Sequence, residues 1–141
     1  MASLEDAYAS YHSASKHLEG FNYAGAVREA QICVELSIKA LLENLDIEYK
    51  KEHDIGDDVF KGVFQKAFPH LKGYEIKQFQ ECLAKSRVYL KLLSSIKNFT
   101  TYTFLDVPAK NLFDKEFAKT MVDYAGQAYW CCVMLSKKIV I

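Results

Sequence analysis

Residues 23–45 read YAGAVREAQICVELSIKALLENL, and this stretch carries the clearest helical signal in the chain. Apolar and small residues recur every three or four positions, the spacing that brings side chains to one face of an α-helix. This stripe consists of Tyr23, Ala26, Ala30, Cys33, Ser37, Leu41 and Leu45, and Val27, Val34, Ile38 and Leu42 widen it. Its small side chains permit close approach of a neighbouring helix, as in an antiparallel bundle.

Helical spacing also marks segments on both sides of this stretch. We expect further helices over residues 4–19, 59–67, 74–98 and 114–139, with a loop over residues 100–112. Ser3, Asn22 and Asp114 are suitable N-caps, and Pro69 ends the short third helix. The pattern predicts an all-α fold, an antiparallel four- to five-helix bundle, formed by a single domain of residues 1–141.

The charge balance argues against a dedicated binder of nucleic-acid duplexes. The 141 residues include 18 basic and 18 acidic side chains, so the formal net charge is zero, whereas duplex-binding domains usually carry a basic excess. Only Arg28 and Arg87 are arginines. Lysine lacks the planar fork with which arginine binds a phosphate through two hydrogen bonds. A local basic patch remains compatible with this composition.

The four cysteines, Cys33, Cys82, Cys131 and Cys132, each stand among apolar residues in a helical pattern. We interpret them as small core residues with reduced thiols. His12, His17 and His70 lack the spacing of metal ligands, so we expect neither a metal nor another cofactor. No signal peptide and no apolar run of about 18 residues is visible, which favours a cytoplasmic protein that does not cross a membrane.

The second half of the last predicted helix is apolar on more than one side. Trp130 and Met134 point roughly opposite the core stripe of this helix, and Tyr129 and Val133 lie between the two faces. A helix that is apolar all round must be covered on more than one side. We expect these four residues to form a homodimer interface. The alternative is a local pocket closed by the loop over residues 100–112.

The first two predicted helices and the segment after them resemble the HEPN family of nucleotide-binding helical domains. The resemblance starts from Ala26, Val27 and Arg28 and continues through Glu35 and the run KALL at residues 39–42. A segment with His53, Asp54 and Ile55 then leads to the next helix. The later helices fit as well, so the resemblance covers most of the chain and implies a bundle of HEPN type.

Many HEPN proteins resemble metal-independent ribonucleases or toxins paired with small nucleotidyltransferases. Their motif is an Arg, four to six residues and a His at the end of the fourth helix, in a cleft shared by two subunits. Aligning this motif on LSSIKNFTTYTF, residues 93–104, places Lys97 at the Arg position and Tyr102 at the His position. Phe104 then stands where some toxins carry a second aromatic residue. The four-residue spacing is kept, and both catalytic residue types are replaced.

These replacements weaken the chemistry that the resemblance implies. Metal-free RNA cleavage needs a base for the 2′-hydroxyl proton and a cation for the phosphate. A free tyrosine has a pKa of about 10, so an unperturbed Tyr102 is a poor base at neutral pH. Lys97 keeps the positive charge without the fork. The alternatives are a lysine at the edge of the core with its amine in water, and a loop tyrosine with a satisfied hydroxyl.

Five further residues are candidates for ligand binding. Arg87 and Asn98 fall on the polar face beside Lys97, and Asp54 could orient the imidazole of His53. Asp54 is equally suited to a turn before the next helix. Arg28 borders the core stripe, where it could bind a ligand or simply pair with an acidic residue.

We therefore expect a non-catalytic or weakly active HEPN domain. It would act as a homodimeric nucleotide- or RNA-binding module, or as the partner of a minimal nucleotidyltransferase in a toxin–antitoxin-like system. A divergent metal-independent ribonuclease that uses Lys97 and Tyr102 is the first alternative. A helical scaffolding protein without a ligand is the second.

Overall fold

The computed structural model describes residues 2–49, 55–101 and 103–140. Over these residues the chain forms the helices α1 (Leu4–Glu19), α2 (Tyr23–Asn44), α3 (Asp57–Ala67), α4 (Gly73–Ile96) and α5 (Lys115–Val140). Three short 3₁₀ helices lie between them: η1 (Phe68–His70), η2 (Lys97–Thr100) and η3 (Ala109–Asn111). The predicted all-α bundle is confirmed, and the helix boundaries agree with the sequence pattern to within about two residues.

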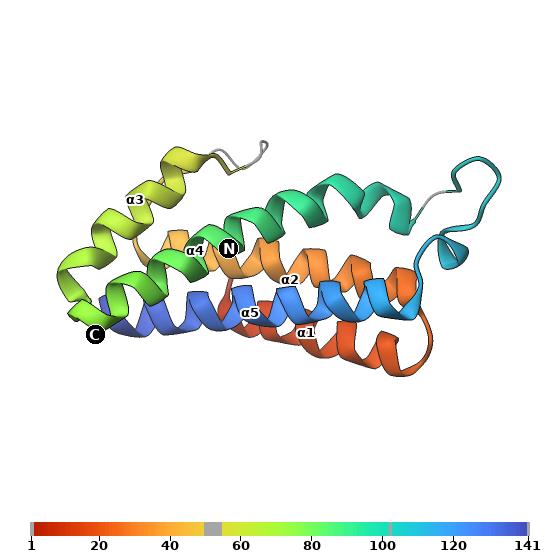
Figure 1. The fold of residues 1–141 in the computed structure, drawn as a ribbon, viewed down its shortest axis with the longest axis horizontal. Coiled ribbons are helices and arrows are strands. Elements are labelled where there is room, and N and C mark those ends of the chain that lie inside the picture. Colours follow the sequence, from red (N-terminus) through yellow and green to blue (C-terminus); the bar gives the residue numbers. More distant parts are fainter. Residues whose placement is uncertain (1, 50–54, 102, 141) are drawn as a thin grey trace.

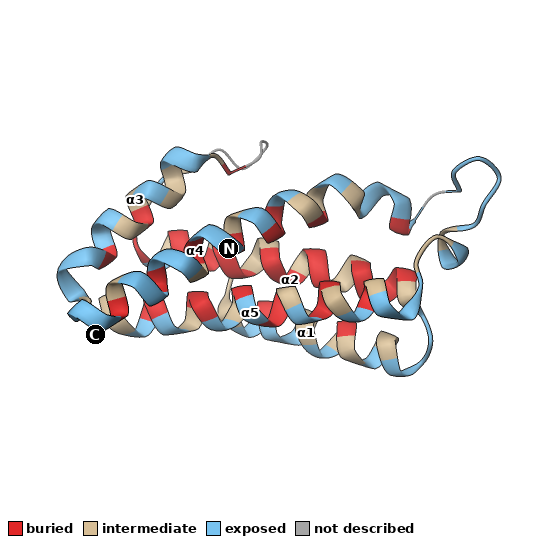
Figure 2. Cartoon of the chain, viewed as in Figure 1, coloured by how far each residue is buried: buried red, intermediate tan, exposed pale blue. Residues whose placement is uncertain are grey.

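The four long helices run alongside one another, and α3 lies outside them against α4 (Figure 1). Helices α1 and α4 run in one direction, and α2 and α5 run in the other. Helix α2 packs against α1, α4 and α5, and α5 packs against α1, α2 and α4. The core therefore lies mainly along α2 and α5, where the buried residues concentrate (Figure 2).

Helices α2 and α5 run in the same direction, and small side chains on both helices allow them to pack closely. Ala30 and Cys33 on α2, and Ala125 and Ala128 on α5, are completely buried. The thiol of Cys33 donates to the backbone carbonyl of Ala125 across a sulfur–oxygen distance of 3.8 Å. Such an approach is possible only where no bulky side chain separates the helices. The expected role of the small residues on the α2 stripe is confirmed.

The predicted caps are present at three helix starts. The backbone N–H of Asp6 donates to the Ser3 hydroxyl at 3.1 Å. The N–H of Gly25 donates to Asn22 Oδ1 at 3.0 Å, and the N–H of Phe117 donates to Asp114 Oδ1 at 2.8 Å. Each contact satisfies an amide that has no partner within the helix, which is why these residue types mark the boundaries.

The start of α4 is fixed to the end of α5 by the buried carboxylate of Glu75. One carboxylate oxygen accepts the backbone N–H of Lys72 at 2.9 Å, and the other lies 2.6 Å from Lys138 Nζ. The hydrogen bonds from Lys138 and Lys72 lower the pKa of Glu75, and the contact with Glu75 raises the pKa of Lys138. This pair sets the orientation of α4, whose far end leads into Lys97.

The cysteine prediction is wrong for two of the four residues. Cys82 on α4 and Cys131 on α5 form a disulfide, with their Cα atoms 6.0 Å apart. The helices are antiparallel neighbours, and this brings together two residues that are distant in sequence. Cys33 and Cys132 are free and buried as predicted, and burial raises the pKa of the Cys33 thiol to about 12.

The segment after η2 contains a tight turn that the pattern describes only as a loop. Phe104 and Val107 exchange two backbone hydrogen bonds of 2.9 and 3.1 Å. Leu105 and Asp106 between them have φ values of 50° and 62°, as in a type I′ turn.

No helix among the described residues is long and apolar enough to span a membrane.

Candidate functional site

Lys97 lies where α4 ends and η2 begins. Its backbone keeps helical angles, φ −58° and ψ −35°, and its side chain is exposed. Thr100 closes the turn, because its buried hydroxyl donates to the carbonyl oxygen of Lys97 at 2.6 Å. The α-helix ends at Ile96, and η2 begins with Lys97. The exposed side chain is compatible both with a phosphate contact and with a lysine whose amine lies in water.

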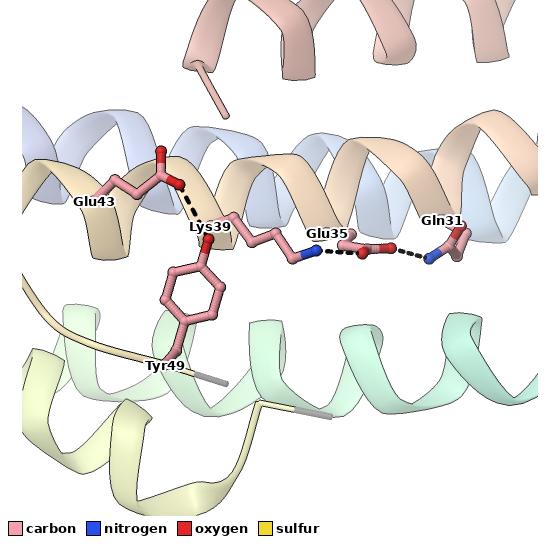
Figure 3. A network of polar contacts seen from close by, with 5 residues as sticks. All are labelled: Gln31, Glu35, Lys39, Glu43 and Tyr49. Atoms are coloured by element: carbon pink, nitrogen blue, oxygen red, sulfur yellow. Dashed lines mark hydrogen bonds and ion pairs between the residues drawn. The ribbon is translucent and has the colours of Figure 1, made fainter. Parts of the chain in front are cut away.

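A row of polar side chains follows α2 on the side that faces α4 (Figure 3). Gln31, Glu35, Lys39 and Glu43 stand four residues apart and therefore share one face of the helix. Glu35 accepts from Gln31 Nε2 at 2.6 Å and from Lys39 Nζ at 2.7 Å. The hydroxyl of Tyr49 donates to Glu43 at 3.1 Å and extends the row.

The positive charge of Lys97 reaches this row, because η2 packs against α2. The pKa of Glu35 is lower than its ordinary value. Burial acts to raise this pKa, but the hydrogen bonds from Lys39 and Gln31, together with the charges of Lys39 and Lys97, outweigh the effect of burial. Glu35 is therefore a carboxylate at neutral pH. Lys39 and Lys97 both act on the Glu35 carboxylate, and with Glu43 counted the row and Lys97 together carry no net charge.

Arg28 lies on the same side of α2 as Glu35. Seven residues separate them, which corresponds to almost two full turns and about 10 Å along the axis. Arg28 is half-buried. Arg28 and Lys39 lie on one side of α2, about 16 Å apart along the axis, and Lys97 lies on η2, which packs against α2. We refer to Arg28, Gln31, Glu35, Lys39 and Lys97 as the junction cluster.

Two of the remaining candidate ligand residues, Asn98 and Arg87, lie within the described part of the chain. Asn98 is exposed in η2 beside Lys97. Arg87 lies ten residues before Lys97, about 15 Å along α4, and contacts α3, with its Nε 2.9 Å from the carboxylate of Asp57. His53, Asp54 and Tyr102 lie outside the described residues, so the motif position predicted for Tyr102 remains a prediction.

The junction cluster is suited to binding an anion more than to transferring a proton. Lys39 and Lys97 supply charge-assisted donors, whereas the buried amide of Gln31 already donates to Glu35. A carboxylate with a lowered pKa, such as Glu35, is a weak general base, because efficient bases have a pKa near the working pH. Among residues 2–49, 55–101 and 103–140, no three His, Cys, Asp or Glu side chains are grouped so as to hold a metal ion.

The predicted interface residues lie on an exposed aromatic surface. Trp130 is 55% exposed and Met134 44%, so neither is covered by the loop after η2. Tyr129 is half-buried between Trp130 and Tyr8 of α1, with ring centroids 5.4 and 5.6 Å away. Tyr8 is itself 49% exposed. We call Tyr8, Tyr129, Trp130 and Met134 the aromatic patch, and half-buried Val133 belongs to the same stretch of α5.

The junction cluster and the aromatic patch each include a residue that the sequence pattern does not identify. Gln31 is 5% exposed, and its four-residue spacing from Glu35 is the signal that could have identified it. Tyr8 follows the apolar spacing of the first helix, which predicts only a place in the stripe of that helix. No sequence signal shows that α1 would place it beside Tyr129.

The chain matches the family model described as HEPN domain over residues 1–132. This match covers nearly the whole chain and includes α1 to α4, η2 and most of α5. No curated protein and no solved structure matches. The helical bundle and the family match agree, and the chain belongs to the HEPN domain family.

Proposed function

We propose that this chain is a non-catalytic or weakly active HEPN domain that binds a nucleotide or single-stranded RNA through the junction cluster. Membership of the HEPN family indicates a nucleotide- or RNA-related function. The observation that carries the proposal is that two cations, Lys39 and Lys97, both act on the ionised Glu35. Phosphate oxygens are the natural ligands of such a group.

The same geometry favours binding of a phosphate group over cleavage of RNA. Lys97 is exposed at the position where ribonucleases of the family carry an arginine, and a lysine acts on phosphate as a point charge. Position 102 is a tyrosine, whose ordinary pKa of about 10 makes it a poor base near pH 7. Contact with a phosphate therefore survives these substitutions better than cleavage does.

The proposal includes a homodimer formed through the aromatic patch, since HEPN domains often dimerise. A further partner class is a minimal nucleotidyltransferase, as in the toxin–antitoxin-like pairs that the family resemblance implies. Exposed aromatic residues that form a continuous surface are typical of protein interfaces. The patch lies on α1 and α5, whereas the junction cluster lies on α2 and η2, so the two can be tested separately.

The test measures binding and cleavage of one fluorescently labelled single-stranded RNA in buffer with EDTA. We expect the wild-type protein to bind without cleaving. Lys97→Ala should weaken binding about three- to tenfold and reduce the salt dependence by about one ion, because a single phosphate contact is lost. Lys97→Arg should restore binding. Lys91→Ala is the matched control, because Lys91 is an exposed lysine on α4, the helix that leads into Lys97.

Three outcomes would contradict the proposal. Absence of RNA and mononucleotide binding by the folded wild type would exclude the junction cluster as a phosphate site. Equal loss of affinity in Lys97→Ala and Lys91→Ala would show only general charge attraction. Cleavage in EDTA that disappears in Lys97→Ala would instead establish the divergent ribonuclease, the alternative that the preserved four-residue spacing favours.

A further inference from the structure

A groove between α3 and α4 lies apart from both surfaces described so far. Its volume is about 450 Å³, within the range of small-molecule sites in proteins. Phe60 and Phe64 of α3 form one wall, and Leu83 and Ala84 of α4 form the other. The two phenylalanines are four residues apart, so both rings lie on the same face of α3.

One end of the groove is closed by a charged pair. The guanidinium carbon of Arg87 lies 5.8 Å from the centre of the Phe60 ring, and Arg87 Nε lies 2.9 Å from Asp57 Oδ1. Arg87 therefore holds the start of α3 against α4. Its side chain is 18% exposed, whereas that of Asp57 is 75% exposed, so the guanidinium forms a wall of the groove.

The polar groups of the groove decide what it can bind. Gln65 and Gln80 offer amides that donate and accept hydrogen bonds. Lys61 is exposed on α3, and it makes no ion pair with any residue that the structure describes. Asp57 and Arg87 are engaged with each other, so Lys61 is the cationic group that the lining offers to a ligand. The groove thus combines an apolar floor with a lysine at its edge.

We propose that this groove binds a small planar aromatic anion, with its ring system against Phe60 and Phe64 and its acidic group at Lys61. Aromatic rings favour flat partners in stacked or edge contacts. The groove extends from Gln80 to Arg87, about 10 Å along α4, which suits a molecule of two fused rings.

This site is independent of the proposed function. Ala84 lies thirteen residues before Lys97, about 20 Å along α4, so a ligand in the groove would not reach the junction cluster. Phe60 and Phe64 are only half-buried, so contacts within the chain leave part of each side chain uncovered. Helix α3 and the stretch of α4 from Gln80 to Arg87 supply all of its lining residues.

The test follows backbone amide chemical shifts of the full chain by NMR during titration with naphthalene-2-carboxylate and with its neutral amide. We expect saturable shifts confined to α3 and to the part of α4 around Gln80 to Arg87, and binding of the carboxylate several times tighter than that of the amide. Ala84→Trp should abolish these shifts, because Ala84 is exposed and an indole there fills the groove. Val88→Trp is the matched control, one turn later on α4 and 60% exposed.

A second variant keeps the test decisive if Ala84→Trp does not fold. Lys61→Gln leaves the groove open and should weaken carboxylate binding about two- to fivefold, with no change for the amide. Shifts absent at millimolar probe, or unchanged by a folded Ala84→Trp, would overturn the site. Equal affinity for carboxylate and amide would overturn its preference for anions.

Discussion

At the scale of single residues, the junction cluster balances attraction for a phosphate against its own internal ion pairs. Glu35 engages Lys39 directly and lies within the electrostatic reach of Lys97. A bound phosphate would compete with Glu35 for these two cations, so Glu35 tunes how strongly the cluster can bind.

We expect Glu35→Gln to raise the affinity for single-stranded RNA about threefold or more at low salt, because the local net charge becomes more positive by one. The same change should lower the free energy of unfolding at pH 7 by about 0.5 kcal/mol, since one partly exposed ion pair is lost. Anisotropy titrations and urea unfolding measure the two effects. Glu29→Gln, on the same helix, is the control.

The pH dependence of stability gives a second readout for the same residue. The pKa of Glu35 is lower in the folded chain than its ordinary value. Its contribution is therefore present above the ordinary carboxyl pKa and is lost as the pH falls through the lower, folded pKa. Wild-type protein should show this loss on acidification, and Glu35→Gln should show less of it. Identical pH profiles for the two proteins would contradict the assignment.

At the scale of helices, the space beside each backbone decides which small residues are required. Gly126 of α5 is buried against α1, and a Cβ atom there would lie 2.9 Å from Cε1 of Tyr11. Gly62 of α3 has nothing within 4 Å of that position. Both glycines lie inside helices and therefore need the same helical backbone angles. The two positions differ in the space beside the backbone.

We expect Gly62→Ala to raise the free energy of unfolding by about 0.5–1 kcal/mol through helix propensity alone. Gly126→Ala gains the same propensity but forces the Tyr11 ring to move, and overpacking of this kind costs about 1–3 kcal/mol. Its net effect should be destabilising. Chemical denaturation of both variants provides the comparison, and a stabilised Gly126→Ala would show that α1 moves aside freely.

At the scale of the whole molecule, the aromatic patch is a surface that the fold of one chain leaves uncovered. It combines α1 and α5, the helices that flank α2, and it lies on the outer surface of α5 away from the α2 core. A second copy bound at the aromatic patch would add no residue to the junction cluster or to the α3–α4 groove. Dimerisation and ligand binding should therefore respond to different substitutions.

We expect Trp130→Ala to weaken self-association about 30-fold, the effect of losing a central aromatic contact worth about 2 kcal/mol. Sedimentation velocity over a concentration series measures the dissociation constant. Tyr74→Ala is the control, because Tyr74 is 74% exposed on α4 and lies outside the patch. A wild-type protein that stays monomeric, or a mutant with an unchanged constant, would refute the interface.

Only two residues of the junction cluster, Arg28 and Lys97, could be named as candidate ligand residues from the order of the residues. The spacing of a motif locates Lys97, and the long second helix contains Arg28 and Glu35. The association of Glu35 and Lys39 with Lys97 could not be predicted, because it depends on how η2 packs against α2. Arg87 shares a helix face with the expected site and yet contacts α3, since tertiary packing sets which helices it joins.

The helices, their caps and the buried stripes follow from the sequence alone, because helical spacing and capping depend on residues within about four positions of each other. The family resemblance follows from the sequence as well. The packing of the helices determines which distant residues meet: the disulfide between Cys82 and Cys131, the effect of Lys97 on Glu35 and the contact of Tyr8 with Tyr129. These contacts depend on the distance and rotation between helices, which no local pattern specifies.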